Sequence, residues 1–299
     1  MDIATVEIQE TKVVGVREKL AAYFELTKPR IAFMLVLTSA AGFYLGADKG
    51  FNVLVFVNAM IGITLLAFGV ATLNQVWERK TDLLMERTAK RPLPTQRVTP
   101  TEALVFGVLL CLIAEIYLVF LVNGLTAILG LVVIVGYVLL YTPLKTRTSM
   151  STAIGAIPGA MPPLMGYTSS AGEITLGAWA LFALLFLWQF PHFLAIAWMY
   201  REQYAKAGIL MLPVIEPEGK ITAQQIVIFT LLLLPVSLAP YFLGVAGLIY
   251  LVGASLLWVW FLAASIQAAR AKSVEKARKL LLVSVLYLPL IFALLVFNH

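Results

Sequence analysis

The chain has very little of the chemistry that soluble enzymes usually use. Its 299 residues contain one cysteine, Cys111, and two histidines, His192 and His299. A single cysteine excludes an intramolecular disulfide and any site built from paired cysteines, and two histidines leave little for a conventional zinc site. Charged residues make up only 13% of the chain, about half of what a typical soluble domain carries. Function must therefore depend on a small polar minority.

The chain is rich in apolar residues where a soluble protein would carry charged ones. They make up 61% of the chain, and the mean hydropathy is +0.92. A soluble globule of this size could not hide so much apolar surface, so lipid must cover much of it. A bilayer core about 30 Å thick requires roughly 20 apolar residues per helix, which predicts an all-α polytopic membrane protein. The nine predicted spans are 30–48, 53–74, 102–122, 125–142, 151–169, 176–198, 223–242, 246–267 and 280–297.

The basic residues indicate how these spans are oriented. Of the 22 lysines and arginines, all but Lys49 fall at the N-terminus or in the even-numbered connections. Because positive charge gathers on the cytoplasmic side of a membrane, the N-terminus is predicted to be cytoplasmic and the C-terminus to lie outside. The net charge of +6 then reflects topology and not nucleic-acid binding. The opening residues lack the pattern of a secretory signal, and a bacterial plasma (inner) membrane is the simplest location.

The first polar cluster lies where the second span is predicted to leave the membrane. Asn74, Glu78 and Asp82 are spaced four residues apart, which puts them along one face of a helix. Two carboxylates and an amide facing one cavity would form the hard-oxygen site that magnesium prefers, completed by substrate phosphate and water. An interfacial amphipathic helix would fit the same spacing. The basic residues of this segment, which would grip a phosphate, are Arg79, Arg87, Lys90 and Arg91.

The second polar cluster begins inside the sixth span. His192 follows Trp188 by one helical turn and comes directly after Pro191. An ionisable residue inside a membrane is a candidate for function, and a packing histidine fits the same position. At the cytoplasmic end of the span, Glu202 and Tyr204 follow. Glu202 would supply a second carboxylate to the same metal site, or it would be a charged cap on the helix.

The fourth connection carries a third polar cluster on the same predicted side of the membrane. Tyr141, Lys145 and Arg147 lie there, and the two basic residues would either hold a leaving diphosphate or anchor the helices. Glycine and proline interrupt the next span, which permits close helix approach, room for a bulky ligand, or a simple bend. Glu115, inside the third span, fits either a cavity or an interhelical hydrogen bond and is assigned to no site.

Four segments together resemble the UbiA-type superfamily of intramembrane prenyltransferases. They are LTKPRI at 26–31, LNQVWERKTDLLMERTAKRPLP at 73–94, YTPLKTRTSMSTAIGAIPGAMPPLMGY at 141–167 and WQFPHFLAIAWMYREQYAKAGILMLPV at 188–214. The combination of ERTxxRPLP, GAxPPLxGY and WQFPHF indicates the branch that farnesylates protohaem IX. The resemblance covers residues 23 to 297. We therefore expect a cytoplasmic segment over 1–22 and a single transmembrane domain over 23–299.

The resemblance implies a fold and a reaction. The fold is a bundle of nine transmembrane helices around a central cavity that opens to the cytoplasmic side. The donor would be farnesyl diphosphate, the acceptor protohaem IX, the cofactor magnesium and the product haem O. Partners would be the lipid bilayer and a downstream haem A synthase or terminal oxidase assembly.

The resemblance also implies roles for individual residues. Asn74, Glu78 and Asp82 fall on the first metal–diphosphate motif, and His192 falls on the PHF motif and would contact haem. The second acidic motif usually ends with an acid directly before the tyrosine. Here that position holds Gln203, and the nearest carboxylate, Glu202, is assigned as a further metal ligand. The residues assigned to the diphosphate or the other substrate are Arg79, Arg87, Arg91, Lys145, Arg147 and Tyr204.

The implied chemistry needs no nucleophilic side chain. Magnesium and the basic residues would neutralise the diphosphate as it leaves the allylic carbon. A haem vinyl group would attack the allylic cation, and water would quench the product cation as a hydroxyl. Two alternatives remain. An aromatic, quinone-precursor prenyltransferase would share the first acidic motif but not WQFPHF, and a non-enzymatic small-molecule transporter would leave the gathering of acids and bases unexplained.

Overall fold

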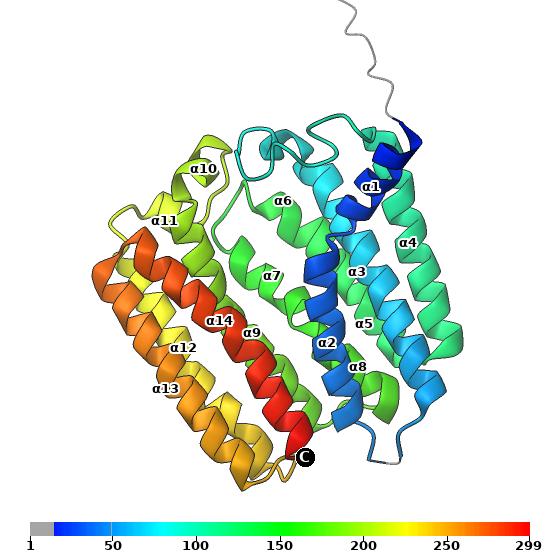
Figure 1. The fold of residues 1–299 in the computed structure, drawn as a ribbon, viewed down its shortest axis with the longest axis vertical. Helices are drawn as coiled ribbons and strands as arrows, with labels where there is room; N and C mark the ends of the chain where they lie inside the picture. Colours follow the sequence, from blue (N-terminus) through cyan, green and yellow to red (C-terminus); the bar gives the residue numbers. More distant parts are fainter. Residues whose placement is uncertain (1–14, 49) are drawn as a thin grey trace, which may run out of the picture.

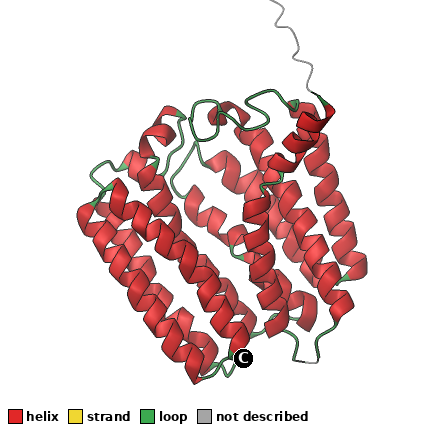
Figure 2. Cartoon of the chain, in the orientation of Figure 1, coloured by secondary structure: helices red, strands yellow, loops and turns green. Residues whose placement is uncertain are grey.

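The described part of the chain is helical. The computed structural model describes residues 15–48 and 50–299, and no strand occurs within these ranges (Figure 2). Lys49, the lone basic residue of its predicted side, lies outside them. The elements are α1 (Val16–Leu26), α2 (Pro29–Leu45), α3 (Val53–Asp82), α4 (Pro100–Leu121), α5 (Gly124–Ile134), the π-helix η1 (Val135–Tyr141), α6 (Thr142–Leu144), α7 (Ser151–Gly159), α8 (Met161–Ala171), α9 (Leu176–Met199), α10 (Arg201–Lys206), α11 (Leu212–Ile215), α12 (Lys220–Phe242), α13 (Leu248–Ala271) and α14 (Val274–Phe297).

Helix α9 is the central helix of the bundle. It packs against α7, α8, α12 and α14, and 61% of its most apolar window is buried, against 22% for α4. Helices α12, α13 and α14 lie on one side of α9, and α3 and α4 lie on the other (Figure 1). The C-terminus lies at the opposite end of the bundle from α1 and α10 (Figure 1). Residues carried by α9 are therefore enclosed by protein more than those of any outer helix.

Seven helical segments are long and apolar enough to cross a membrane by length and composition. They correspond to seven of the predicted spans, and the prediction of an all-α, multi-pass membrane protein is confirmed. The predicted span 30–48 corresponds to α2, an apolar helix of 17 residues. The predicted span 151–169 is divided between α7 and α8. The seven segments are α3, α4, Gly124–Leu144, α9, α12, α13 and α14.

The break between α7 and α8 follows from the local sequence. Pro162 and Pro163 occupy the first turn of α8, where a missing N–H is tolerated. Neither proline can donate to the carbonyls at the end of α7, so that helix stops. A Cβ at Gly159 would collide with the Gln189 side-chain oxygen of α9. The Gln189 amide donates to the Ala156 carbonyl at 3.1 Å, which ties the broken span to the central helix.

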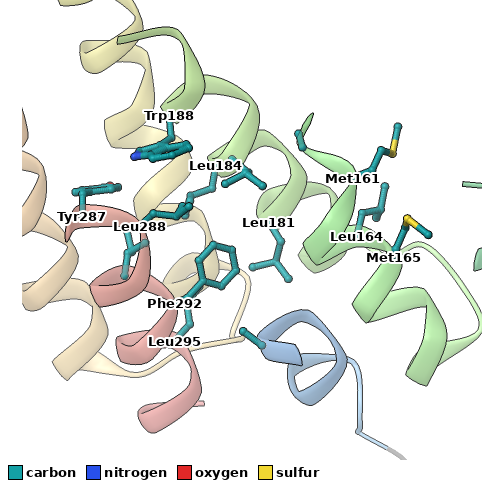
Figure 3. Packing of buried hydrophobic residues seen from close by; sticks show 14 of the residues in the cluster. Met161, Leu164, Met165, Leu181, Leu184, Trp188, Tyr287, Leu288, Phe292 and Leu295 are labelled. Carbon is teal, nitrogen blue, oxygen red and sulfur yellow. The ribbon is translucent and has the colours of Figure 1, made fainter. Parts of the chain in front are cut away.

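One cluster of buried apolar residues extends from α2 to α14. Figure 3 shows part of it, where Leu184 and Trp188 of α9 lie close to Tyr287 and Leu288 of α14. The helices on either side of α9 therefore share one continuous core.

Helices α2 and α8 approach each other closely at two glycines, one on each helix. A Cβ on Gly42 would fall on the carbonyl oxygen of Pro163, and a Cβ on Gly166 would fall on that of Ser39. Small residues allow such close packing of helices in membranes. Because the facing atoms belong to the backbone, no side chain can move aside to admit a larger residue.

Replacing Gly42 with alanine should loosen α2 from α8. The added methyl group would meet the Pro163 carbonyl, and overpacking of this kind costs about 1–3 kcal/mol in the free energy of unfolding. The measurement is the thermal unfolding midpoint of the protein in detergent. Gly124→Ala is the matched control, because a Cβ there meets nothing within 4 Å. Equal midpoints for the two variants would contradict the close contact.

Candidate functional site

Helix α3 carries the first predicted cluster on one unbroken helix. The second span was predicted to leave the membrane at residue 74, but α3 runs on to Asp82. Asn74, Glu78 and Asp82 therefore follow one another along a single face. Asn74 and Asp82 are each only 1% exposed, and the side chain of Glu78 is 12% exposed. Two acidic groups are thus largely withdrawn from water at one end of the bundle.

Basic side chains from two other segments pair with these carboxylates. Lys145 Nζ lies 2.5 Å from Glu78 Oε1, and Arg91 Nη1 donates to the two Asp82 carboxylate oxygens at 2.9 and 2.8 Å. The same Arg91 nitrogen is 3.9 Å from Glu78 Oε2. Burial would lower the pKa of Lys145, but the Glu78 carboxylate outweighs it and holds that pKa well above its ordinary value. The two carboxylates therefore converge on one cationic atom.

Lys28 completes the cluster, although it was not among the predicted site residues. Its Nζ donates to Asn74 Oδ1 at 2.7 Å, and Asn74 Nδ2 donates to Thr142 Oγ1 at 3.1 Å. Lys28 precedes Pro29 and adopts the left-handed conformation, with φ 49°. Burial and the nearby Arg91 charge lower the pKa of Lys28 to about 7. The LTKPRI segment contains this lysine, but only the fold shows that its amine reaches α3.

An irregular helix positions Lys145. The π-helix η1 leads into α6, where Pro143 has no N–H to give to the preceding turn. The Tyr137 carbonyl accepts both the Thr142 backbone N–H and the Thr142 hydroxyl, the latter at 2.7 Å. Lys145 Nζ lies 4.4 Å from the centre of the Tyr141 ring. Single π turns are frequent at functional sites, and this one delivers a lysine and an aromatic ring to the acids of α3.

Arg87 joins the second predicted cluster to the first. Its Nη2 donates to the Tyr204 hydroxyl at 3.0 Å, and its backbone N–H donates to Gln203 Oε1 at 3.4 Å. Gln203 stands where the resemblance leads one to expect an acid. The amide therefore holds the connection after α3 against α10, and the basic group of Arg87 lies beside Tyr204.

Three of the predicted charged residues do not join the cluster. Glu202 and Arg147 are both exposed, and no ion pair links either one to the described residues of the cluster. Arg79 turns back along its own helix and donates to the Val76 carbonyl at 2.8 Å. The assignment of Glu202 as a metal ligand has no support from this geometry, because its neighbours Gln203 and Tyr204 are the residues that face Arg87.

The oxygen donors available to a metal ion are therefore few. Within residues 15–48 and 50–299, no group of three His, Cys, Asp or Glu side chains could hold a metal. Glu78 and Asp82 supply two carboxylates, so an ion there would need the Asn74 amide, water or substrate oxygens besides. Glu115 does not contribute to this site, because its side chain lies against Gly130 of α5. Its buried carboxylate oxygens have no hydrogen-bond partner among the described residues.

His192 lies apart from the charged cluster. Its Nδ1 is 2.8 Å from Ser284 Oγ of α14, and its ring stacks on Trp188 with centroids 4.6 Å apart. The residue is half-buried. Unlike the acids of α3, it has only neutral polar and aromatic neighbours among its described contacts.

Comparisons with known proteins agree with one another. Residues 35–294 match the profile of the UbiA prenyltransferase family. A protein of Solibacter usitatus named protoheme IX farnesyltransferase is 48% identical, and the match covers 93% of this chain and 98% of that protein. A protein of the same name from Salinibacter ruber is 45% identical, covering 91% and 96%. A third, from Koribacter versatilis, is 44% identical and covers 95% of each chain.

Solved structures share the fold at low sequence identity. A digeranylgeranylglyceryl phosphate synthase aligns with a TM-score of 0.79 at 17% identity, covering 94% of this chain and 98% of that one. A UbiA homologue from Archaeoglobus fulgidus bound to DMAPP and Mg²⁺ aligns with a TM-score of 0.63 at 18% identity, covering 91% and 98%.

Removing one member of the Asp82–Arg91 pair should cost more stability than removing both. Arg91→Met would leave a buried, unpaired carboxylate, which costs about 3–5 kcal/mol, whereas Arg91→Met combined with Asp82→Leu leaves no charge behind. Unfolding free energies of the two single variants and the double variant give the coupling between the residues.

The exposed pair Glu275–Lys276 supplies the matched cycle, with Glu275→Gln and Lys276→Met. Its side chains are 83% and 35% exposed, so its coupling should stay below about 1 kcal/mol. Additive effects of the Asp82 and Arg91 substitutions would show that the buried pair is not coupled.

Proposed function

Since the chain belongs to the UbiA prenyltransferase family, we propose that it transfers the farnesyl group of farnesyl diphosphate to a vinyl group of protohaem IX. It is an enzyme of the prenyl-transferring class, and its products are haem O and diphosphate. The observation that carries this proposal is the near full-length identity of 44–48% to proteins named protoheme IX farnesyltransferase. The buried group of acids and bases at one end of the bundle gives that activity a site.

Asn74, Glu78 and Asp82 are the residues that would hold a magnesium ion. Carboxylate and amide oxygens are the hard ligands that magnesium accepts, usually alongside substrate phosphate. Both carboxylates already approach a single cationic atom, Nη1 of Arg91, so they are arranged to share a cation. When bound, the ion acts as a Lewis acid that neutralises charge on the leaving diphosphate. Glu202 has no part in this proposal, because its side chain is exposed on α10.

Basic residues around these acids hold the diphosphate. Lys145 and Arg91 pair with carboxylates in the described structure, and they turn to diphosphate oxygens when substrate and metal enter. Lys28 and Arg87 border the same cluster. They add positive charge that attracts the departing diphosphate. Tyr204 orients Arg87 through its hydroxyl. Arg79 and Arg147 lie outside this inner set and belong to its electrostatic surroundings.

The reaction needs charge stabilisation more than proton transfer. The bond between the allylic carbon and the diphosphate oxygen breaks, and its electron pair leaves with the diphosphate. Basic side chains already fixed in place stabilise this developing charge without reorganising. The electrons of the haem vinyl group then form the new carbon–carbon bond. Water adds to the resulting cation and loses a proton, which leaves the hydroxyl group of haem O. His192 contacts the haem in this arrangement.

The proposed topology has nine spans, with the charged cluster opening to the cytoplasm. Helix α2 and the pair α7–α8 supply the two further spans that bring the seven long apolar segments to nine. A single domain covers 23–299, the N-terminal segment 1–22 is cytoplasmic and the C-terminus lies outside a bacterial inner membrane. Residues 1–14 of that segment lie outside the described residues. This orientation puts the cluster on the basic side of the membrane. The downstream partner is a haem A synthase or a terminal oxidase assembly.

The purified protein should convert protohaem IX to haem O when given farnesyl diphosphate and Mg²⁺. Mass analysis of the extracted haem would show the mass of an added farnesyl group and a hydroxyl, because one vinyl group becomes hydroxyethylfarnesyl. A phosphate assay would show equal release of diphosphate. Asp82→Ala should abolish both signals, because it removes a metal ligand at the buried end of α3. Unmodified haem after incubation with the folded wild-type protein, farnesyl diphosphate and Mg²⁺ would overturn the proposal.

Glu115→Gln is the matched control for Asp82→Ala, since Glu115 is an acid in α4 that stands outside the cluster. It should keep turnover near the wild-type rate. Both variants should insert into the membrane to the same extent, as measured by their yield after detergent extraction. Full turnover by Asp82→Ala would contradict the metal assignment while leaving the overall reaction intact.

Lys28→Gln should lower kcat/KM for farnesyl diphosphate at least about tenfold, because it removes a cation fixed beside the diphosphate. The measurement is initial rates of diphosphate release over a range of farnesyl diphosphate concentrations. Arg30→Gln, two residues along the chain and exposed, is the matched control and should change kcat/KM little. Equal losses of kcat/KM in both variants would mean that Lys28 acts only through the overall positive charge at this end of the bundle.

A further inference from the structure

Ser284 of α14 forms hydrogen bonds with two side chains of the central helix α9. Its carbonyl accepts the Trp188 indole N–H at 2.9 Å, and its hydroxyl lies 2.8 Å from His192 Nδ1. Trp188 and His192 are one helical turn apart, and their rings stack with an interplanar angle of 25°. Ser284 is completely buried. The orientation of the imidazole is therefore fixed on its Nδ1 edge and on one face.

The hydrogen bonds of Ser284 decide which imidazole nitrogen carries the proton. A serine hydroxyl has one hydrogen to donate and lone pairs to accept with. The Leu281 carbonyl lies 2.7 Å from the hydroxyl and can only accept, and we assign the hydrogen to it. With this assignment the Ser284 oxygen accepts from His192, and Nδ1 carries the proton. In the neutral imidazole, Nε2 is left with an unshared lone pair.

His192 Nε2 has no hydrogen-bond partner among the described residues, and it is also absent from the buried polar atoms that lack one. This atom therefore keeps some exposed surface, although α9 is the most enclosed of the candidate spans. A polar atom with a free lone pair inside a membrane protein is costly unless something binds it.

Half-buried positions of α9 lead from His192 to the end of the helix where the charged cluster lies. His192, Ile196 and Tyr200 are half-buried and follow one another at four-residue intervals along α9 and its end. The Tyr200 ring centre lies 4.7 Å from the Arg87 guanidinium carbon. At 1.5 Å per residue, His192 lies about 12 Å from Tyr200 along the helix. The histidine is thus deeper in the bundle than the residues proposed to hold the diphosphate.

We propose that His192 Nε2 is an axial ligand of the iron in the substrate porphyrin, and that Ser284 is the positioning residue that fixes its tautomer. The inference rests on the proposed function, which makes an iron porphyrin the acceptor. Binding forms one coordinate bond from the Nε2 lone pair to iron and releases no proton, because Nδ1 already holds it. The iron is anchored at the depth of His192, and the porphyrin edge that bears the vinyl groups extends toward the charged cluster.

The contacts of His192 match those of metal-binding histidines in general. Such histidines almost always donate their second ring N–H to an oxygen acceptor, which sets the tautomer and raises the basicity of the ligating nitrogen. Stacking on Trp188 fixes the ring plane as well. A histidine that served packing alone would not need an accessible Nε2.

The full-length protein, made without a polyhistidine tag and labelled with ¹⁵N-histidine, allows a direct test with ferric protohaem IX. The chain has only two histidines, so His299→Ala is the matched control for His192→Ala. Pulsed EPR should detect ¹⁵N coupling to iron in the wild type and in His299→Ala, and none in His192→Ala. Added imidazole should restore the wild-type optical spectrum to haem-loaded His192→Ala. Coupling that survives in His192→Ala, or is missing from the wild type, would overturn the proposal.

Variants of Ser284 test its positioning role. Ser284→Ala should weaken haem binding about 10–100-fold, the usual effect of losing such a supporting contact, and Ser284→Thr, which keeps the hydroxyl, should recover most of the affinity. Ser255→Ala is the matched control, because Ser255 donates to the Leu251 carbonyl from α13 and touches no histidine ring in the described contacts. Equal haem affinities for Ser284→Ala and Ser255→Ala would show that Ser284 does not position the ligand.

Failure of this inference can be told apart from failure of the proposed function. Conversion of haem by the wild type with no ¹⁵N coupling would leave the farnesyl transfer in place and remove the iron–histidine bond. Coupling in the wild type with no haem O formed would show a haem-binding protein whose reaction is different.

Discussion

The burial of two carboxylates at the end of α3 is the constraint on which the arrangement of the site depends. Asp82 and Glu78 are almost withdrawn from water, and an isolated charge in such a position is too costly to persist. Each acid therefore needs a cation within reach. Arg91 comes from the connection that follows α3, and Lys145 comes from the end of α6. Segments far apart in the sequence are held together by this requirement.

Irregular backbone occurs where these cations are delivered. Lys28 adopts a left-handed conformation just before α2, and Lys145 follows a π-helix and a proline turn. A regular helix spaces its side chains along its own axis, so it could not direct several of them to one point on α3. The long outer helices α12 and α13 contain no π-helix. Lys272, which ends α13, is left-handed like Lys28, but its amine donates to the Glu218 carbonyl and does not reach the cluster.

Sequence patterns predicted what depends on local periodicity. Helical spans follow from runs of apolar residues, and the common face of Asn74, Glu78 and Asp82 follows from their spacing. Patterns could not predict which bases would reach these acids, because that depends on pairing between distant elements. Lys28 was overlooked for this reason. Glu202 is the nearest acid in the sequence, but the short helix α10 turns its neighbours Gln203 and Tyr204 toward Arg87.

The same ion pairs would allow the folded site to accept the proposed metal and diphosphate without unfolding. A buried ion pair contributes little net stability, because the attraction within it roughly offsets the loss of hydration. Moving Lys145 and Arg91 from carboxylates to diphosphate oxygens, while a cation takes their place on the acids, keeps every charge paired throughout. The fold then depends on the apolar core around α9, and the charged cluster is free to exchange partners. With stability assigned to the core, the residues of the cluster would be able to bind and release the proposed substrate repeatedly.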